Sequence, residues 1–442
     1  MPRSPKLPAP SFELVHHTLD NGLRIVLAPD RSAPVVGVAV LYDVGFRSEP
    51  EGRTGFAHLF EHLMFQGSAN LEKLEHFRYV QSSGGMFNGS THFDYTNYFE
   101  ALPSNALERG LFLEADRMLG PRLTEENLAN QLEVVKNEIR VNVLNSPYGG
   151  FPWIYLPNVL FDTFANSHNG YGGFEDLEQA TVADAKDFFN KYYAPANAVL
   201  AVGGDLDVDQ TIALVDKHFG VIKKRRAPKR PSFAEPALTA ERRATHDDPN
   251  APMPAVAIGY RVPDPVGSLD AHLANLLLSE VLSDGDASRL QQRLVHRDHL
   301  VTDIGAYLGE FGDPFDERDP TAFTITAHYP DARSLKAILR AVDEEIEQVA
   351  QSGLVVGELD RVRTRLVSVL LRELDSVLAR TLEFAKFQLI YGRAELIGEL
   401  PGRLAAITED ALRAAAAELR PDRRAVLELT PSGHAPTAGG AK

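Results

Sequence analysis

The two halves of this 442-residue chain repeat one order of predicted elements. In the first half, a Val-rich strand at 35–44 precedes a helix from about 55 to 65. In the second half, a strand-like segment at 254–261 precedes a helix at 269–282. The repeat is far too long for a solenoid unit, so the pattern indicates a duplicated domain. Each copy mixes strands with helices, and this predicts an α+β fold in which a sheet packs against several helices.

The predicted domain boundaries follow from a change of composition near the middle of the chain. Residues 223–231 read Lys-Lys-Arg-Arg-Ala-Pro-Lys-Arg-Pro. Such a run is typical either of a nucleic-acid or localisation patch or of a solvated linker, and its central position favours the linker. We therefore predict a first domain at 1–222, a basic Pro-rich linker at 223–245, a second domain at 246–430 and a flexible tail at 431–442.

The charge balance and the lack of cysteine exclude several function classes. There are 45 Lys and Arg residues against 61 Asp and Glu, a formal net charge of -16. Nucleic acid is therefore not expected as a partner, whereas a cationic ligand or a basic peptide would be attracted. The chain has no cysteine, which excludes disulfides, thiol nucleophiles and cysteine-ligated metals.

The N-terminal segment is rich in proline and polar residues and lacks the apolar core of a signal peptide. No later segment approaches the roughly 18 uninterrupted apolar residues of a membrane span. We expect a cytoplasmic protein without a membrane span. A periplasmic protein is the alternative if a signal peptide has been removed.

The segment at 55–67 carries the pattern with the clearest chemistry. His58 and His62 are four residues apart, so on a helix they lie on one face and can bind one metal ion. Glu61 lies beside them, where it can accept a proton from metal-bound water. Zinc suits this set, because it accepts imidazole ligands and in catalytic sites keeps one position for water. The order H-x-x-E-H is the inverse of the zincin motif.

A third ligand is predicted on the helix at 124–144. One face of that helix carries Leu128, Gln131, Val135 and Glu138. The apolar members indicate that the face is buried, and a buried carboxylate needs a partner such as a metal ion. A salt bridge from Glu138 to Lys136 or Arg140 is the alternative. Glu133 is a weaker candidate ligand, because it lies nearer a polar face.

These motifs together resemble the pitrilysin/insulinase (M16) family of zinc peptidases. The resemblance rests on His58-Leu-Phe-Glu61-His62, on the segment from Glu133 to Glu138, and on Gly84–Thr91, which is similar to the family's edge strand. It extends over most of the chain, and the size is similar to the short two-domain type that includes mitochondrial processing peptidase. The resemblance implies a clamshell of two homologous domains, each with a mostly antiparallel sheet.

The resemblance also implies roles for individual residues. His58, His62 and Glu138 would bind one Zn²⁺ per chain, and Glu61 would be the general base of an endopeptidase. Gln131 stands behind the metal where many relatives have Glu, so it can donate a hydrogen bond but carries no charge. The expected substrate-binding residues are those of the edge strand, where an extended peptide would pair: Asn88, Gly89, Ser90 and Thr91.

The second half lacks this metal motif. Aligning Gly285 with Gly67 places three unsuitable residues opposite the motif: Leu276, Ser279 and Glu280. Active relatives carry an Arg and Tyr pair that holds substrate, and Val295 and Thr302 occupy those places here. We therefore expect the metal-bearing subunit of a heterodimer whose homologous partner supplies the pair. A homodimeric peptidase and a non-catalytic scaffold subunit are the alternatives.

Overall fold

The computed structural model describes residues 10–432. The N-terminal segment judged above for a signal peptide lies almost entirely outside this range, as does most of the predicted tail. Within residues 10–432, no helix is both long and apolar enough to cross a bilayer.

The first half of the chain contains six strands and nine helices within the described residues. The strands are β1 (Val15–Thr18), β2 (Arg24–Pro29), β3 (Val35–Tyr42), β4 (Met86–Thr91), β5 (Thr96–Pro103) and β6 (Ala198–Gly204). The helices are α1 (Phe56–Leu63), α2 (Glu75–Ser82), α3 (Leu107–Leu119), α4 (Glu125–Ile139), α5 (Leu156–Leu160), α6 (Phe164–Ser167), α7 (Phe174–Glu178), α8 (Val182–Tyr192) and α9 (Val208–Phe219). A π-helical turn at 140–144 extends α4.

The second half contains five strands and six helices within the described residues. The strands are β7 (Arg242–Asp248), β8 (Ala255–Val262), β9 (Asp303–Leu308), β10 (Thr321–His328) and β11 (Arg424–Pro431). The helices are α10 (Leu269–Ser283), α11 (Leu335–Ser352), α12 (Glu358–Glu373), α13 (Val377–Ile390), α14 (Leu396–Ala406) and α15 (Glu409–Glu418). A π-helical segment covers 291–297.

The two sheets repeat one topology, which confirms the predicted α+β duplication. Their strand orders are β1-β2-β6-β3-β5-β4 and β7-β11-β8-β10-β9. Each sheet has one parallel pair, β2 with β6 and β7 with β11, and its other pairs are antiparallel. Strand β1 is the one addition in the first sheet. Strand β4, which carries the predicted substrate-binding residues, lies at a sheet edge.

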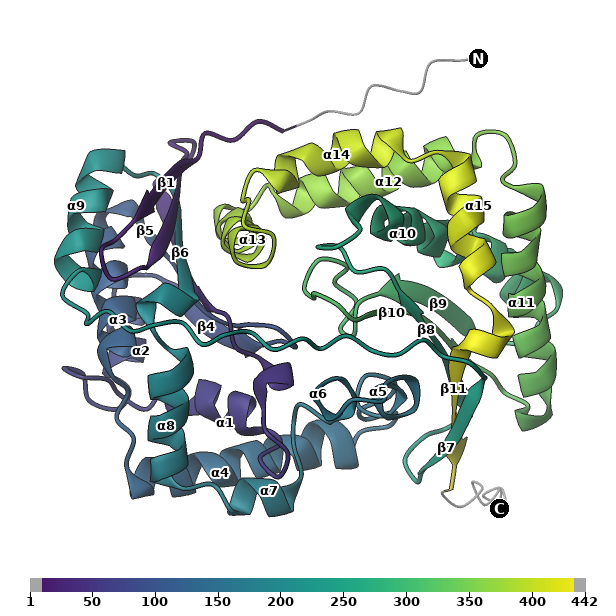
Figure 1. Cartoon of the computed structure of the whole chain (residues 1–442), viewed down its shortest axis with the longest axis horizontal. Coiled ribbons are helices and arrows are strands. Elements are labelled where there is room, and N and C mark those ends of the chain that lie inside the picture. The colour runs from purple at the N-terminus through teal and green to yellow at the C-terminus, as the bar shows by residue number, and fades with distance from the viewer. Residues whose placement is uncertain (1–9, 433–442) are drawn as a thin grey trace, which may run out of the picture.

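Each half contributes a helix that packs on the sheet of the other half, and one hydrophobic core contains residues of both halves. Helix α13 of the second half packs on β3 and β6 of the first sheet, while α5 of the first half packs on β8 and β11 (Figure 1). The contact with α13 is close, because a Cβ atom added at Gly37 or Gly203 would lie 2.8 or 2.4 Å from Thr381 Oγ1. One face of the first sheet therefore belongs to the same hydrophobic cluster as the second half.

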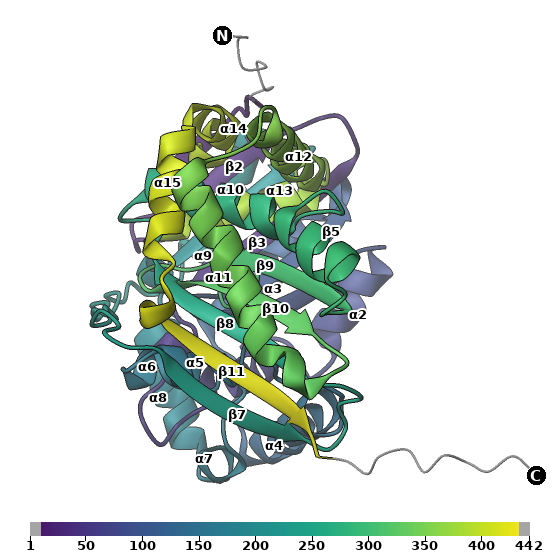
Figure 2. The same ribbon diagram turned by 90° about the vertical axis from the view of Figure 1, so that its right-hand side faces the viewer.

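The buried faces of the strands explain this arrangement. Along β3, Val38 and Val40 belong to the core of the first half, whereas Ala39 and Leu41 belong to the shared core. A strand that is apolar on both faces needs a layer on each side. On the second sheet, α11 supplies the outer layer, and it crosses in front of the strands in Figure 2.

Two strands differ from the predicted boundaries. Strand β7 begins at Arg242, inside the range 223–245 assigned to the linker. Its side chains alternate between partly buried and exposed because it is an edge strand paired to β11 alone. Strand β9 follows directly on Thr302, in a region for which no strand was predicted.

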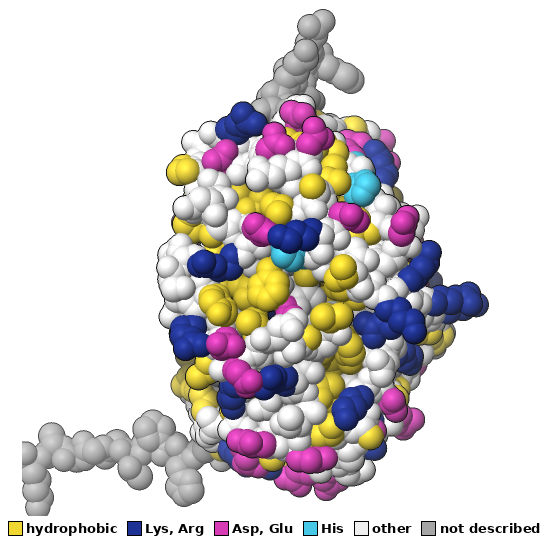
Figure 3. Space-filling model, turned by 90° about the vertical axis from the view of Figure 1, so that its left-hand side faces the viewer, with side chains coloured by type: hydrophobic (Ala, Val, Ile, Leu, Met, Phe, Trp, Pro, Cys, Tyr) yellow, Lys and Arg dark blue, Asp and Glu magenta, His cyan; other side chains and the backbone are white. Residues whose placement is uncertain are grey.

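Two arginines of the basic linker form contacts with the first half. Arg225 donates to the Tyr193 carbonyl and stacks on Phe189. Arg230 forms ion pairs with Asp43 and Asp94. Elsewhere on the first half, the surface carries basic, acidic and hydrophobic side chains side by side (Figure 3). The contacts of Arg225 and Arg230 support the interpretation of 223–231 as a linker rather than a free basic patch.

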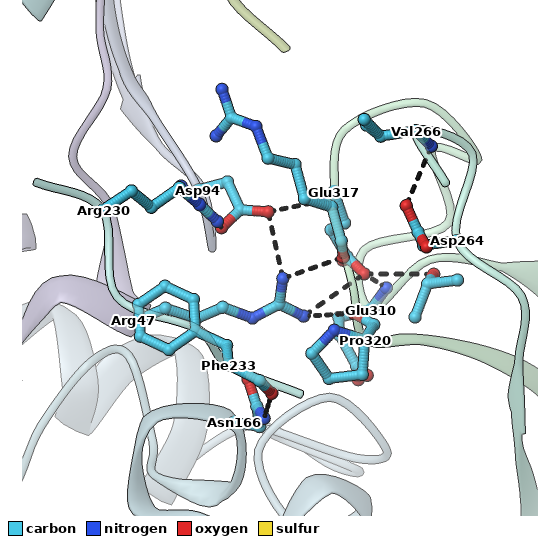
Figure 4. A network of polar contacts seen from close by, with 12 residues as sticks. Arg47, Asp94, Asn166, Arg230, Phe233, Asp264, Val266, Glu310, Glu317 and Pro320 are labelled. Atoms are coloured by element: carbon cyan, nitrogen blue, oxygen red, sulfur yellow. Dashed lines mark hydrogen bonds and ion pairs between the residues drawn. The ribbon is translucent and has the colours of Figure 1, made fainter. Parts of the chain in front are cut away.

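A buried network joins the two hairpin loops that correspond in the repeat, 92–95 and 309–320 (Figure 4). Arg47, which is 2% exposed, donates to Asp94 Oδ2 at 3.0 Å and to the carbonyl of Pro320 at 2.6 Å. The Arg318 amide also donates to Asp94, at 2.6 Å. Burial alone would raise the pKa of Asp94, but Arg47 and the neighbouring guanidinium groups lower it to about 2. The Asp94 carboxylate is therefore ionised at neutral pH.

Candidate metal centre and substrate cleft

Helix α1 starts at a position that a buried carboxylate determines. Glu49 accepts hydrogen bonds from the backbone N–H groups of Gly55 and Ala57, at 2.9 and 2.6 Å. Negative charge at a helix N-terminus satisfies free N–H groups and interacts favourably with the helix dipole. His168 lies 2.9 Å from Glu49 and completes the support. Gly55 has φ of 78°, and a Cβ there would lie 2.3 Å from the Tyr171 carbonyl oxygen.

The predicted metal ligands converge on one point. His58 and His62 lie on α1, and Glu138 lies on α4, which packs against α1. One donor atom from each lies within 4.8 Å of the others. The two imidazole Nε2 atoms are 3.3 Å apart, and the Glu138 oxygens lie 3.4 Å from His62 Nε2 and 3.7 Å from His58 Nε2.

These separations fit a tetrahedral zinc ion. Zinc binds imidazole nitrogen and carboxylate oxygen at about 2.0–2.2 Å, which places neighbouring tetrahedral donors roughly 3.3–3.6 Å apart. The donor set, two histidines and one glutamate, is also a common set for catalytic zinc.

The protonation of the three ligands suits metal binding. Burial and the neighbouring His62 together lower the pKa of His58 to about 4, so the His58 lone pair is free at neutral pH. Burial also lowers the pKa of His62, but its hydrogen bond to Glu138 and the nearby carboxylates outweigh this and raise it. The hydrogen bond from His62 lowers the pKa of Glu138. A cation bound between these groups would take the place of the proton on His62 beside Glu138.

The side chain of Glu61 contacts strand β4, which carries the predicted substrate-binding residues. Thr91 Oγ1 donates to Glu61 Oε2 at 2.6 Å and links α1 to the end of β4. Burial raises the pKa of Glu61, and the hydrogen bond from Thr91 opposes that rise. A carboxylate with a raised pKa is a better proton acceptor than one in water.

The other candidate residues of α4 differ in their position relative to the predicted ligands. Gln131 is buried, and its side-chain amide donates to Asn130 Oδ1 at 2.8 Å. Glu133 is exposed and pairs with Lys136, which also pairs with Glu178. Lys136 therefore does not meet Glu138, and the alternative of a salt bridge between those two is absent.

The structure adds two residues that the sequence analysis did not assign. Tyr171 donates from its hydroxyl to Glu138 Oε1 at 3.1 Å and stacks edge-on against the His58 ring. Glu49 anchors the start of α1 by accepting from the amides of Gly55 and Ala57, and His168 pairs with it. No motif spacing marks either residue, because Glu49 lies in an irregular turn before α1 and Tyr171 reaches Glu138 from a loop.

The predicted substrate-binding residues lie along the edge strand. Asn88 is exposed on β4, while Gly89, Ser90 and Thr91 line a cleft beside His58 and Glu61. Strand β4 pairs with β5 on one side, and no strand within residues 10–432 pairs with its other side.

In the second half, the residues aligned with the metal motif and with the Arg and Tyr pair do not contribute to the cleft. Leu276 and Ser279 are buried in α10, and Ser279 bonds the Leu276 carbonyl. Glu280 pairs with Asp284 rather than with histidines. Val295 packs against the hydrophobic core, and Thr302 donates to the His328 carbonyl. None of them lines the cleft beside His58.

A second cluster with metal-ligand residue types holds a guanidinium. His76, Glu100 and Glu114 lie close together and are buried. Arg117 lies 2.8 Å from His76 Nε2 and 3.1 Å from Glu114 Oε1. The arginine already supplies the positive charge there, so the cluster is a buried ionic network of the core.

Comparison with known families assigns the chain. Residues 24–150 match the model described as Insulinase (Peptidase family M16), and residues 179–366 match the model described as Peptidase M16 inactive domain. The zinc protease PqqE of Helicobacter pylori is 31% identical over 354 residues, which cover 78% of this chain and 77% of that protein. The chain therefore belongs to the M16 peptidase family, and the sequence-based recognition is confirmed.

Two further comparisons agree on the fold and class. An uncharacterized zinc protease of Mycobacterium bovis is 25% identical over 432 residues, covering 98% of this chain and 96% of that protein. The crystal structure of a protease from Helicobacter pylori superposes with a TM-score of 0.87 at 27% identity, covering 95% of this chain and 100% of that one. The chain has the M16 fold and resembles zinc proteases in sequence.

Proposed function

We propose that this chain is a zinc-dependent endopeptidase that cleaves peptides or unfolded segments. The observation that carries the proposal is the convergence of His58, His62 and Glu138 on one point beside Glu61 and the open edge of β4. The match of the second half to an M16 inactive domain agrees with its lack of a metal motif. His58, His62 and Glu138 lie outside the matched residues 179–366. The presence of this complete donor set in the first half argues against a non-catalytic scaffold.

The chemistry divides among a small number of residues. Zinc held by His58, His62 and Glu138 would polarise the scissile carbonyl and lower the pKa of bound water toward ~7. Glu61 accepts the proton of the attacking water and later delivers it to the leaving amine, so that one water is consumed for each bond cleaved. The edge of β4 pairs with the extended substrate backbone and aligns it with Glu61.

Removal of the metal tests this proposal. Dialysis against a strong zinc chelator is expected to abolish cleavage of a quenched peptide, and stoichiometric zinc is expected to restore it. Metal analysis should find about one zinc per chain. A Glu138→Gln variant should lose zinc affinity by at least about tenfold, since it removes a charged ligand. Full activity in metal-depleted protein would contradict the proposal.

We also propose that the chain is the metal-bearing subunit of a heterodimer. Val295 and Thr302 stand where relatives carry the Arg and Tyr that hold substrate, and neither lines the cleft. A homologous partner would then supply that pair. A cytoplasmic location remains a prediction from the sequence.

Assembly with a partner gives a direct test of the heterodimer. The purified chain alone is expected to be nearly inactive, and addition of a homologous M16 subunit encoded beside it should raise kcat/KM by at least tenfold. Size-exclusion chromatography with light scattering reports the assembly. Equal activity with and without the partner, with the chain running as a homodimer, would favour the homodimeric peptidase.

A further inference from the structure

A serine, a histidine and an aspartate form a chain of close polar contacts at the end of β4. Ser90 Oγ lies 2.9 Å from His92 Nε2, and His92 Nδ1 lies 2.8 Å from Asp316 Oδ2. Ser90 belongs to β4, His92 follows the strand, and Asp316 comes from the second half of the chain. A hydroxyl, an imidazole and a carboxylate in this order are the groups that activate a serine nucleophile in hydrolases.

Asp316 is buried as an ionised carboxylate. Lys386 Nζ lies 3.2 Å from its Oδ1, and the Tyr95 hydroxyl donates to the same oxygen at 2.8 Å. Burial alone would raise the pKa of Asp316, but Lys386 and His92 lower it. The other carboxylate oxygen, Oδ2, is the one that faces His92.

The ring of His92 is fixed between its two neighbours. It stacks on the Tyr95 ring, with the centroids 4.3 Å apart and the planes at 13°. An ionised carboxylate only accepts hydrogen bonds, so Asp316 favours the tautomer of His92 that carries its proton on Nδ1. The lone pair of Nε2 then faces the Ser90 hydroxyl. That hydroxyl also lies 2.9 Å from Asn97 Oδ1, and rotation about its Cβ–Oγ bond moves the proton from one acceptor to the other.

Ser90 and His92 lie on the opposite face of β4 from Glu61. Side chains alternate along a strand, and Thr91, which lies between the two residues, donates to Glu61. The His92 amide donates to the Tyr95 carbonyl at 2.8 Å, so the alternation of an antiparallel pair points the Thr91 amide toward the open edge. The amide of the residue after the nucleophile is a donor that stabilises the oxyanion in serine hydrolases.

The Ser90 hydroxyl has space beside it for a small substrate. Ser90 is half-buried, and Ser90 and His92 both line the cleft of about 400 Å³. Phe311 of the second half lines the same cleft, so both halves of the chain border this space. A cleft of this volume is large enough for a small molecule.

We infer that Ser90, His92 and Asp316 form a second hydrolytic site, which cleaves small carboxylic esters without the metal. Ser90 Oγ attacks the ester carbonyl carbon and its proton passes to His92 Nε2, which then protonates the leaving alcohol. Water attacks the acyl group on Ser90 in the same way and regenerates the hydroxyl. One ester and one water therefore give one acid and one alcohol. Asp316 is a positioning residue, because it holds the ring of His92.

Covalent labelling of the purified chain tests the nucleophile. A fluorophosphonate probe forms a phosphonyl ester with an activated serine, and fluoride and the hydroxyl proton are released. Mass spectrometry of the labelled chain is expected to find the probe on Ser90, and Ser90→Ala should lose this label. Ser82→Ala is the matched control, because Ser82 is exposed and its hydroxyl donates to the Tyr79 carbonyl rather than to a histidine. This control should be labelled like the wild type.

A variant of His92 separates reactivity from a purely structural role. His92→Ala should slow the labelling of Ser90 by at least about tenfold, and added imidazole should restore part of the rate because a free ring can accept the proton. A structural role of the ring would not respond to imidazole in this way. An unlabelled Ser90 in the wild type, or labelling at the wild-type rate in His92→Ala, would overturn the inference.

Hydrolysis of p-nitrophenyl acetate tests the role of Asp316. Asp316→Asn should lower kcat by at least about tenfold and leave KM within about twofold, since Asp316 does not touch the ester. Ser90→Ala should lose the hydrolysis that persists in the wild-type chain after zinc chelation. Hydrolysis that stops on chelation and survives in Ser90→Ala would belong to the metal centre and would overturn the inference.

This second site goes beyond the proposed peptidase function and does not depend on it. Labelling of Ser90 is expected both with zinc bound and after chelation, whereas peptide cleavage is expected with zinc alone. A chain that is labelled on Ser90 but cleaves no peptide in the presence of zinc and its partner would overturn the peptidase proposal only. A chain that cleaves peptides but leaves Ser90 unlabelled would overturn the second site only.

Discussion

In the chain assembled with its partner subunit, replacement of Glu61 by Gln is expected to lower kcat/KM for a quenched peptide by at least about a thousandfold while zinc content stays near one per chain. Gln keeps the shape of the side chain and can still contact Thr91, but it cannot accept the proton of the attacking water. Loss of a general base costs about 10²–10⁴ in rate, and burial of Glu61 favours the upper part of that range.

A matched control is available on α4. Glu133 is exposed and pairs with Lys136 away from the metal ligands, so Glu133→Gln should retain activity within about twofold. Steady-state kinetics and metal analysis of both variants decide the matter. Substantial turnover by Glu61→Gln with zinc bound would show that another group accepts the proton.

Replacement of Arg47 by Met is expected to destabilise the protein by about 3–5 kcal/mol, the usual cost of removing one partner from a buried ion pair. The change removes one of the two guanidinium groups that pair with the buried carboxylate of Asp94, leaving only Arg230, and it frees the carbonyl of Pro320.

Urea unfolding of the purified chain measures the loss in free energy. Arg333→Met is the control, because Arg333 is exposed and its ion pair with Asp331 is local. That variant should remain within about 0.5 kcal/mol of the wild type. The double variant Arg47→Met/Asp94→Asn should recover part of the loss, since it removes the buried negative charge that Arg47 no longer helps to balance. A change below 1 kcal/mol in Arg47→Met would refute the role assigned to the network.

Local pattern was sufficient to predict which three side chains with metal-ligand chemistry come together. His58 and His62 lie one helical turn apart, and Glu138 lies on the buried face marked by Leu128 and Val135, so helical periodicity alone brings each donor to the correct side of its helix. The duplicated α+β plan was also readable, because strand and helix patterns recur in the same order in both halves. These features depend on residues close together in the chain.

Local pattern was not sufficient for the supports of the site. Glu49 reaches the start of α1 by a turn of irregular backbone, and Tyr171 reaches Glu138 from a loop, so no periodic signal marks them. Strand β7 was assigned to the linker because an edge strand with a mostly polar sequence, Arg242–Asp248, lacks the apolar alternation of a half-buried strand.

The sequence by itself determined the class of chemistry and the duplicated plan, because the donor types, their helical spacing and the order of elements are local properties. Tertiary structure alone decided that α13 covers the first sheet, that α5 covers the second, and that Phe311 enters the cleft. Such contacts join residues far apart in the chain. These contacts join two apolar faces and a buried ion network. The surfaces involved become complementary only after both sheets have assembled.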